Sequence, residues 1–273
     1  MSPTSAANRV RLHVEDSGGD GKPVVLIHGW PLSAESWKAQ VGPLRDAGHR
    51  VIAYDRRGFG RSDKPEGGYD YDTLTDDLAG LLEEHDLRDV ALVGFSMGGG
   101  EVARYISRYG EERVRSVVFA SAVPPFLMKS DDNPDGPLTK EAAKEMEDGL
   151  KADREKFFDG FSTKFFSAKG TLKVTEAQRQ EAIAVCLQSD QTAALACMKA
   201  FGTTDFREDL KKVTVPTLVL HGDSDGTVPF EGSGKRTHAA IAGSQVVLLR
   251  DAPHGCNVSH ADEFNDSLLA FLA

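Results

Sequence analysis

The sequence has few cysteines and no long apolar run, and each shortage excludes a class of protein. Its three cysteines, Cys186, Cys197 and Cys256, cannot all pair within the chain and are too few for a disulfide framework. No apolar run approaches the roughly 18 residues that a membrane-spanning helix needs. Because residues 1–7 also lack a basic segment followed by an apolar one, we expect no signal peptide, no membrane partner and a reducing, cytoplasmic location.

Positive charge is also in short supply. The chain has 32 Lys and Arg against 42 Asp and Glu, and it contains no Lys/Arg-rich run. Binding to a phosphate backbone is therefore not expected, which excludes nucleic acid as a partner. The composition, 40% hydrophobic and 27% charged over 273 residues, is typical of one α/β domain with room for an insertion.

The most informative stretch, residues 90–109, predicts a strand, a sharp turn and a helix in immediate succession. Four apolar residues lead into a G-x-S-x-G pentapeptide centred on Ser96, and apolar residues then recur at helical spacing. A serine at the tip of such a turn is exposed for attack, and its flanking glycines, Gly94 and Gly98, allow strand and helix to pack closely. The following residue, Met97, opens the helix, so its unpaired N–H would face developing negative charge.

Strand patterns alternate with helical patterns in both outer parts of the chain but not in the middle. This alternation predicts a mostly parallel sheet with helices on both faces. From Val123 to Arg207 helical patterns continue and aromatic residues are frequent, but no strong strand pattern appears. We therefore expect a helical cap at 123–207, inserted into a core formed by 1–122 and 208–273. Phe126 and Phe158 are expected to line an apolar pocket, and most other aromatic residues of this stretch to form the core of the cap.

Other candidate residues also follow predicted strands. The second strand leads into a loop in which Gly29 lets the backbone approach a ligand, so the N–H of Trp30 is a second candidate oxyanion donor. The last two strands lead into loops that carry Asp223, Asp225 and His254. Because ligands of parallel sheets bind beyond the carboxyl ends of the strands, we expect these loops to meet at one site.

These residues are the types that nucleophilic catalysis requires. A serine hydroxyl needs a base within hydrogen-bond reach, and an imidazole needs an acid on its other nitrogen. Ser96, one of the two aspartates and His254 supply these groups, and their order along the chain is the one associated with the α/β-hydrolase fold. The residues alone leave Asp223 and Asp225 as competing candidates for the acid.

Taken together, the motifs resemble the α/β-hydrolases over essentially the full length of the chain. More narrowly, they are similar to the bacterial cofactor-free haloperoxidases and their relatives, the aryl esterases, perhydrolases and γ-lactamases. The segments that carry this resemblance are 28–33, 54–60, 94–99, 221–225 and 252–255.

The resemblance implies a fold, a set of catalytic roles and the absence of a cofactor. The fold is an α/β-hydrolase fold with a mostly parallel, eight-stranded sheet. The implied roles are Ser96 as nucleophile, His254 as base, Asp225 as the orienting acid, and the N–H groups of Trp30 and Met97 as the oxyanion hole. Asp223 is then expected to hydrogen-bond local backbone, as turn aspartates do.

Several other residues of reactive type are expected to have no catalytic role. No His/Asp/Glu cluster at metal-ligand spacing occurs, so no metal is predicted. His28 and His221 come directly after strands and are interpreted as structural loop residues. Cys256, close to His254 in the sequence, is expected at the pocket rim and not as a nucleophile.

Pro31 is the residue that indicates which branch of the family the chain resembles. We also expect it to line the substrate pocket, together with Phe126 and Phe158. In the family, a proline after the oxyanion tryptophan resembles the perhydrolase and haloperoxidase branch. Proline fixes φ and removes an N–H, which would reshape the backbone beside the acyl carbonyl and let hydrogen peroxide compete with water. The alternative, a rigid loop without chemical consequence, remains open.

We therefore expect a serine carboxylesterase that acts on small-molecule esters, with perhydrolase activity when hydrogen peroxide is present. Two alternatives remain: hydrolysis of a strained lactam by the same triad, and a ligand-binding protein that keeps the fold without catalysis. The resemblance also allows a homo-oligomer, although the sequence identifies no interface.

Overall fold

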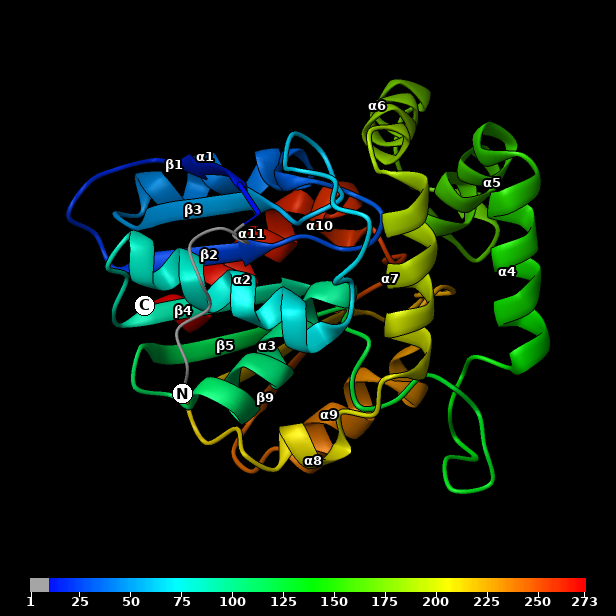
Figure 1. Ribbon diagram of the computed structural model, residues 1–273. Coiled ribbons are helices and arrows are strands. Elements are labelled where there is room, and N and C mark those ends of the chain that lie inside the picture. Colours follow the sequence, from blue (N-terminus) through cyan, green and yellow to red (C-terminus); the bar gives the residue numbers. More distant parts are fainter. Residues whose placement is uncertain (1–9) are drawn as a thin grey trace.

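A seven-stranded sheet forms the centre of the computed structural model, which describes residues 10–273 (Figure 1). The spatial order is β1-β3-β2-β4-β5-β8-β9. Strand β1 runs antiparallel to β3, and all other neighbouring pairs are parallel. The strands are β1 (His13–Asp16), β2 (Pro23–Ile27), β3 (Arg50–Asp55), β4 (Val90–Phe95), β5 (Val114–Ala120), β8 (Thr217–Gly222) and β9 (Gln245–Leu249). The expected mostly parallel sheet is confirmed.

The expected strand count of eight is wrong for residues 10–273, where this sheet has seven strands. Strand β1 is short, because its partner β3 ends opposite its first residue. His13 lies opposite Asp55, the last residue of β3, so the chain before His13 has no continuing partner on β3. Residues 1–9, where no signal peptide was expected, lie outside the described part of the chain.

The central strands are buried on both faces because their sequences are nearly continuous apolar runs. Every residue of β4 and β8 is buried, and β2 and β5 each have a single half-buried residue. Side chains on both faces of these strands therefore contribute to the core, and the strand ends are held firmly in place.

Helices cover both faces of the sheet, as the alternation predicted (Figure 1). Helices α1 and α11 pack against each other on one face together with the short α10, whereas α2, α3, α8 and α9 form a contact series on the other. These helices are α1 (Lys38–Asp46), α2 (Tyr71–Glu84), α3 (Met97–Tyr109), α8 (Arg207–Leu210), α9 (Gly234–Ala240), α10 (Cys256–Ser259) and α11 (Ala261–Leu272), with 3₁₀ turns η2 (Ala34–Trp37) and η3 (Phe230–Gly232).

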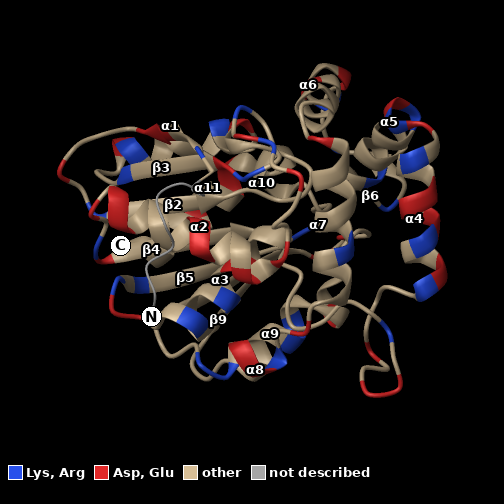
Figure 2. Cartoon of the chain, in the orientation of Figure 1, with Lys and Arg blue, Asp and Glu red and all other residues tan. Residues whose placement is uncertain are grey.

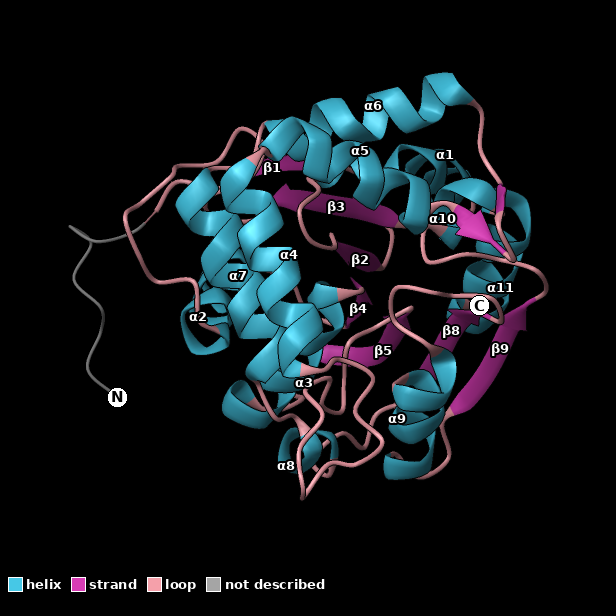
Figure 3. Cartoon of the chain, turned by 90° about the vertical axis from the view of Figure 1, so that its right-hand side faces the viewer, coloured by secondary structure: helices cyan, strands magenta, loops and turns pink. Residues whose placement is uncertain are grey.

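Between β5 and α8 the chain forms a cap that lies over the ends of the central strands (Figure 3). Its helices are α4 (Lys140–Ala152), α5 (Arg154–Phe165), α6 (Glu176–Leu187) and α7 (Gln191–Thr203). Each begins at a Thr or Asp whose side chain accepts a backbone N–H of the first turn. We keep residues 123–207 as the proposed extent of the cap.

The cap also contains a short hairpin that the sequence analysis did not expect. Strands β6 (Ser167–Ala168) and β7 (Thr171–Leu172) pair antiparallel around Lys169 and Gly170. Both central residues have positive φ, 51° and 79°, which is the backbone that two-residue hairpin turns of type I′ require. Gly170 adopts such a backbone readily, whereas Lys169 is not a residue type that favours it, so the sequence signal for this turn was weak.

Charged residues of both signs are mixed along the outer helices, most visibly on α4 (Figure 2). Several of them form ion pairs within one helix, such as Lys144 with Asp148 at 2.5 Å. Exposed pairs of this kind contribute little stability. Among the helices within residues 10–273, none has the length and apolar character required to cross a bilayer.

Candidate active site

Ser96 stands at a sharp turn between β4 and α3, as predicted. Its backbone has φ 52° and ψ −116°, outside the regions that non-glycine residues ordinarily occupy. The turn is tight enough that neighbouring positions have no space for a side chain. A Cβ atom on Gly94 would lie 2.5 Å from the carbonyl oxygen of Gly98, and one on Gly98 would collide with the carbonyl oxygen of Ile27.

Three side chains from separate loops form a continuous hydrogen-bond chain at this turn. The Nε2 atom of His254 lies 2.9 Å from Oγ of Ser96, and its Nδ1 atom lies 2.7 Å from Oδ2 of Asp225. Ser96 follows β4, Asp225 follows β8 and His254 follows β9. The loops meet because these strands are parallel and end at the same edge of the sheet.

The geometry separates the two candidate acids. Oδ1 of Asp225 accepts the backbone N–H groups of Thr227 and Val228, which leaves Oδ2 directed at the imidazole. Oδ1 of Asp223 instead accepts the backbone N–H of Asp251 and a local hydroxyl. Asp223 therefore joins two loops by local hydrogen bonds, and Asp225 alone contacts the histidine.

The electrostatics of the chain favour an ionised Asp225. Burial by itself would raise the pKa of this carboxyl, but the imidazoles of His254 and His221 outweigh burial and hold its pKa well below the ordinary value. Nε2 of His221 lies 2.8 Å from the carbonyl oxygen of Val228 and therefore donates to it. An ionised carboxylate can accept Nδ1–H of His254 and leave Nε2 free to accept the serine proton.

Two backbone N–H groups beside Ser96 are available to a ligand. Within residues 10–273, the N–H of Trp30 and that of Met97 have no hydrogen-bond acceptor in the protein. The loop that carries Trp30 lies directly against the serine, since a Cβ atom on Gly29 would be 3.0 Å from Cβ of Ser96. The indole of Trp30 is fixed from the cap side, because its Nε1 donates to the carbonyl of Ala194 at 2.9 Å.

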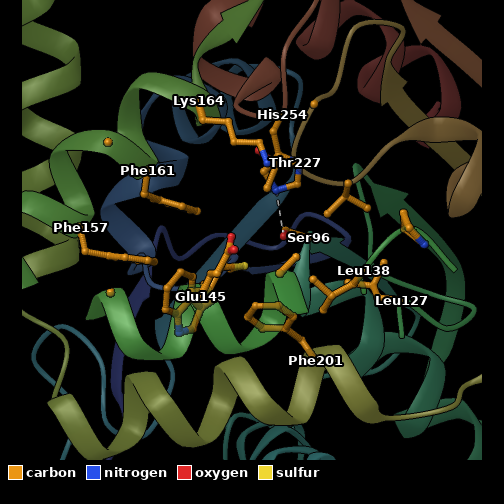
Figure 4. A pocket seen from close by; sticks show the side chains of 18 of the residues that line it. Ser96, Leu127, Leu138, Glu145, Phe157, Phe161, Lys164, Phe201, Thr227 and His254 are labelled. Carbon is orange, nitrogen blue, oxygen red and sulfur yellow. Dashed lines mark hydrogen bonds between the residues drawn. The ribbon is translucent and has the colours of Figure 1, made fainter. Parts of the chain in front are cut away.

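Ser96 and His254 open onto a cavity of about 780 Å³ between the sheet and the cap (Figure 4). This volume is in the range of small-molecule sites. The lining is mostly apolar, and the cap supplies much of it. Among the lining residues are Trp30, Leu127, Leu138, Met146, Phe157, Phe161, Phe201 and Val228.

None of the three residues expected in the pocket belongs to its lining. Phe158 is fully buried and packs against the indole of Trp30, with ring centroids 6.1 Å apart. Phe126 stacks under the guanidinium of Arg207, which lies 5.4 Å from its ring. Pro31 is buried within a hydrogen-bonded turn that follows Trp30.

The neighbours of two of these residues face the cavity instead. Phe157 lines it and Phe158 does not, because successive residues on a helix point about 100° apart. Similarly, Leu127 lines the cavity while Phe126 faces away from it. Phe161, four residues after Phe157, lies on the same face of α5 and also lines the cavity. This spacing places the two rings on one face, but it does not tell which face of the helix borders the cavity.

The remaining reactive residue types are placed away from the reacting atoms. Cys256 is fully buried beside Ser121 and does not line the cavity, and burial raises the pKa of its thiol to about 12. Burial likewise lowers the pKa of His28 to about 3. Within residues 10–273, no three His, Cys, Asp or Glu side chains are grouped in a way that could hold a metal ion.

Comparison with known proteins gives a consistent family assignment. Residues 22–261 match the family model described as the alpha/beta hydrolase fold. A non-heme chloroperoxidase from Kitasatospora aureofaciens is 44% identical over 93% of both chains. A bifunctional esterase/perhydrolase from Acinetobacter calcoaceticus is 36% identical over 100% of this chain and 99% of the other.

Solved structures agree with these relatives. The crystal structure of a bromoperoxidase from Bacillus anthracis superposes with a TM-score of 0.95 at 54% identity, covering 96% of this chain and 95% of that one. An esterase from Exiguobacterium antarcticum superposes with a TM-score of 0.91 at 32% identity, covering 96% of each chain. The chain therefore belongs to the α/β-hydrolase fold family and is a relative of its non-heme haloperoxidases.

Proposed function

We propose that the chain is a serine hydrolase of carboxylic esters that works through an acyl-enzyme. The observation that carries this proposal is the hydrogen-bond chain from Ser96 through His254 to Asp225 beside an apolar cavity. The N–H groups of Trp30 and Met97, which have no acceptor among residues 10–273, would complete the site as an oxyanion hole.

Acylation begins with the proton of the Ser96 hydroxyl. This proton passes to Nε2 of His254 while Oγ forms a bond to the ester carbonyl carbon. Negative charge moves onto the carbonyl oxygen, which accepts hydrogen bonds from the N–H groups of Trp30 and Met97. Asp225 stabilises the imidazolium through Nδ1–H. When the carbon–oxygen bond to the leaving group breaks, His254 returns its proton to the departing alkoxide.

Deacylation repeats these steps with water. His254 takes a proton from water through Nε2, and the water oxygen forms a bond to the acyl carbon. The second tetrahedral intermediate uses the same two backbone donors. It collapses when the bond to Oγ of Ser96 breaks, and the serine recovers its proton from His254. The products are the free carboxylic acid and the starting enzyme.

The cavity favours esters with an apolar acyl or alcohol group. Aromatic rings of Trp30, Phe157, Phe161 and Phe201 line it, and Leu127 and Leu138 add aliphatic surface (Figure 4). Burial of apolar ligand surface against such a lining is the main favourable contribution to binding. We therefore propose esters with an apolar acyl or alcohol group as the substrate class.

Covalent labelling tests the hydrolase proposal directly. A fluorophosphonate is expected to modify Ser96, because attack by its Oγ on phosphorus displaces fluoride and leaves a stable adduct. Peptide mass spectrometry after digestion identifies the labelled residue, and Ser96→Ala serves as the control that should remain unlabelled. A wild-type protein that takes up no label would instead favour a ligand-binding role without catalysis.

We further propose that hydrogen peroxide replaces water in deacylation. Peroxide gives a proton to Nε2 of His254, its oxygen attacks the acyl carbon, and Oγ of Ser96 leaves, so the product is a peracid. The peracid can then oxidise bromide to hypobromite in free solution and become the carboxylic acid. The name of the Acinetobacter calcoaceticus relative, a bifunctional esterase/perhydrolase, supports this extension.

Pro31→Leu is expected to separate the two reactions. Pro31 lies in a turn closed by the hydrogen bond from Leu32 N–H to the Gly29 carbonyl, directly beside the proposed oxyanion donor. The variant should keep hydrolysis of p-nitrophenyl acetate but lose most bromination of monochlorodimedone in acetate, peroxide and bromide, because the backbone beside the acyl carbonyl is reshaped. If both proteins hydrolyse the ester and neither brominates, the chain is a plain carboxylesterase.

A further inference from the structure

The two proposed oxyanion donors come from segments that are far apart in the sequence. The N–H of Trp30 follows β2, and that of Met97 opens α3. The two segments pack without an intervening side chain, since a Cβ atom on Gly98 would lie 3.1 Å from the carbonyl oxygen of His28. Oxyanion donors act only when both are at hydrogen-bond distance from one oxygen. Something must therefore fix the loop of Trp30 relative to α3.

On the loop side, Arg56 holds the residue two positions before Trp30. Nη2 of Arg56 donates to the carbonyl of His28 at 2.7 Å, and the backbone N–H of Arg56 donates to Nε2 of His28 at 2.9 Å. Because Nε2 accepts, the proton of the neutral ring is on Nδ1, which donates to the carbonyl of Gly29 at 2.8 Å. His28 is thus held at its carbonyl and at both ring nitrogens.

On the helix side, the same guanidinium pairs with Glu101 of α3. Nε of Arg56 donates to Oε1 of Glu101 at 2.6 Å, and the hydroxyl of Tyr54 donates to Oε2 at 2.9 Å. Glu101 lies one helical turn after Met97. A single arginine therefore connects the loop that precedes one donor to the helix that begins with the other.

A tyrosine of α2 holds the second donor residue directly. The hydroxyl of Tyr71 donates to the carbonyl of Met97 at 3.0 Å, and its ring is almost fully buried. This contact fixes the peptide that follows Met97 in the first turn of α3.

The burial of the ion pair indicates a role other than stability. The side chains of Arg56 and Glu101 are 1% and 0% exposed. Removing two charges from water costs about as much as their attraction returns, and apolar replacements of similar volume are often as stable. An ion pair that contributes little stability but imposes a fixed geometry is suited to setting the distance between two structural elements.

We propose that Arg56, Glu101 and Tyr71 are positioning residues that hold the backbone donors Trp30 and Met97 at the spacing an oxyanion requires. None of them lines the cavity that Ser96 opens onto, so they act on the reaction only through the backbone. This inference rests on the proposed ester hydrolysis, because that reaction is what develops the oxyanion.

Glu101→Gln tests the inference with little change of volume. The amide cannot accept from both partners as a carboxylate does, so the loop and the helix are less firmly connected. We expect kcat/KM for p-nitrophenyl acetate to fall about tenfold, since misplaced donors stabilise the transition state less. The inhibition constant of an aryl trifluoromethyl ketone, whose adduct with Ser96 carries an oxyanion, should rise by the same factor. The Kd of p-nitroacetanilide, measured in the Ser96→Ala background so that the amide cannot be attacked, should stay within about twofold.

A neighbouring ion pair provides the matched control. Arg57 and Asp77 form a partly buried pair at 2.5 Å, with side chains 10% and 14% exposed, and neither lines the cavity. Asp77→Asn should lower the urea midpoint of unfolding without changing the ketone inhibition constant. If Glu101→Gln also changes only the midpoint, its role is structural and the inference is wrong.

Tyr71→Phe keeps the test decisive if Glu101→Gln does not fold. This variant lacks one hydroxyl. It is expected to raise the ketone inhibition constant about threefold while the Kd of p-nitroacetanilide is unchanged. An unchanged inhibition constant in a folded Tyr71→Phe contradicts the inference. A wild-type protein that hydrolyses no ester and takes no label at Ser96 would instead overturn the proposed function. An active wild type with unaltered variants overturns this inference alone.

Discussion

Ser96→Gly is expected to abolish ester hydrolysis and, at the same time, to give a more stable protein than Ser96→Ala. Loss of the nucleophile should lower kcat at least about 10⁴-fold in both variants. The two variants differ because the residue has φ 52° and ψ −116°. Backbone strain in this conformation destabilises a residue with a Cβ atom by about 1–3 kcal/mol, whereas glycine adopts it without this strain. The greater flexibility of glycine in the unfolded chain destabilises the folded protein by about 0.4–1 kcal/mol. The free energy of unfolding of Ser96→Gly is therefore expected to exceed that of Ser96→Ala by about 1 kcal/mol.

Initial rates with p-nitrophenyl acetate and urea unfolding curves measure the two effects separately. Ser96→Ala is the matched control, since it lacks the hydroxyl but keeps the strained Cβ atom. Hydrolysis that persists in either variant would show that another group is the nucleophile. A glycine variant less stable than the alanine variant would contradict the assignment of strain to this turn.

Asp225→Asn is expected to lower kcat about 10⁴-fold, while Asp223→Asn leaves it within about twofold. Asparagine at position 225 can present its NH₂ group to His254, which then holds the imidazole with the proton on Nε2 and prevents it from accepting the serine proton. Asp223 contacts Ser224 and the backbone of Asp251, and an amide oxygen can accept the same bonds.

Rates with one activated ester, measured for both asparagine variants, check this prediction. A fluorophosphonate should also label Asp225→Asn much more slowly than the wild type, because the carboxylate that orients the histidine is lost. Asp223→Asn should be labelled at nearly the wild-type rate. A large loss in Asp223→Asn with a small loss in Asp225→Asn would reverse the assignment of the acid.

The three residues of the hydrogen-bond chain, which we propose to be catalytic, could be predicted from the sequence because each follows a strand with a clear apolar pattern. The strand before Ser96 and the helix after it were both found where the pattern placed them, and the parallel sheet brings the loops of Asp225 and His254 to the same edge. Local chemistry and one topological rule were sufficient for this part of the site.

The pocket could not be predicted in the same way. Phe157 and Phe158 are adjacent and equally apolar, and the cap has a core of its own, so the pattern does not say which ring faces the ligand. Only the packing of the folded chain decides it, since both rings contact Trp30 but Phe158 is fully buried and Phe157 lines the cavity. The ion pair of Arg56 and Glu101 could not be predicted from the sequence either, because the two residues lie 45 positions apart on different elements.

The cap has a consequence for how substrate range can change in this protein. The proposed catalytic side chains, Ser96, Asp225 and His254, lie at the sheet edge. Much of the cavity wall, including Phe157 and Phe161, belongs to the cap helices. If the proposed function is correct, mutations in these helices are expected to change which ester binds without moving the three side chains at the sheet edge. A mutant library confined to the cap is therefore expected to yield variants with different substrate preferences in which the residues at the sheet edge are unchanged.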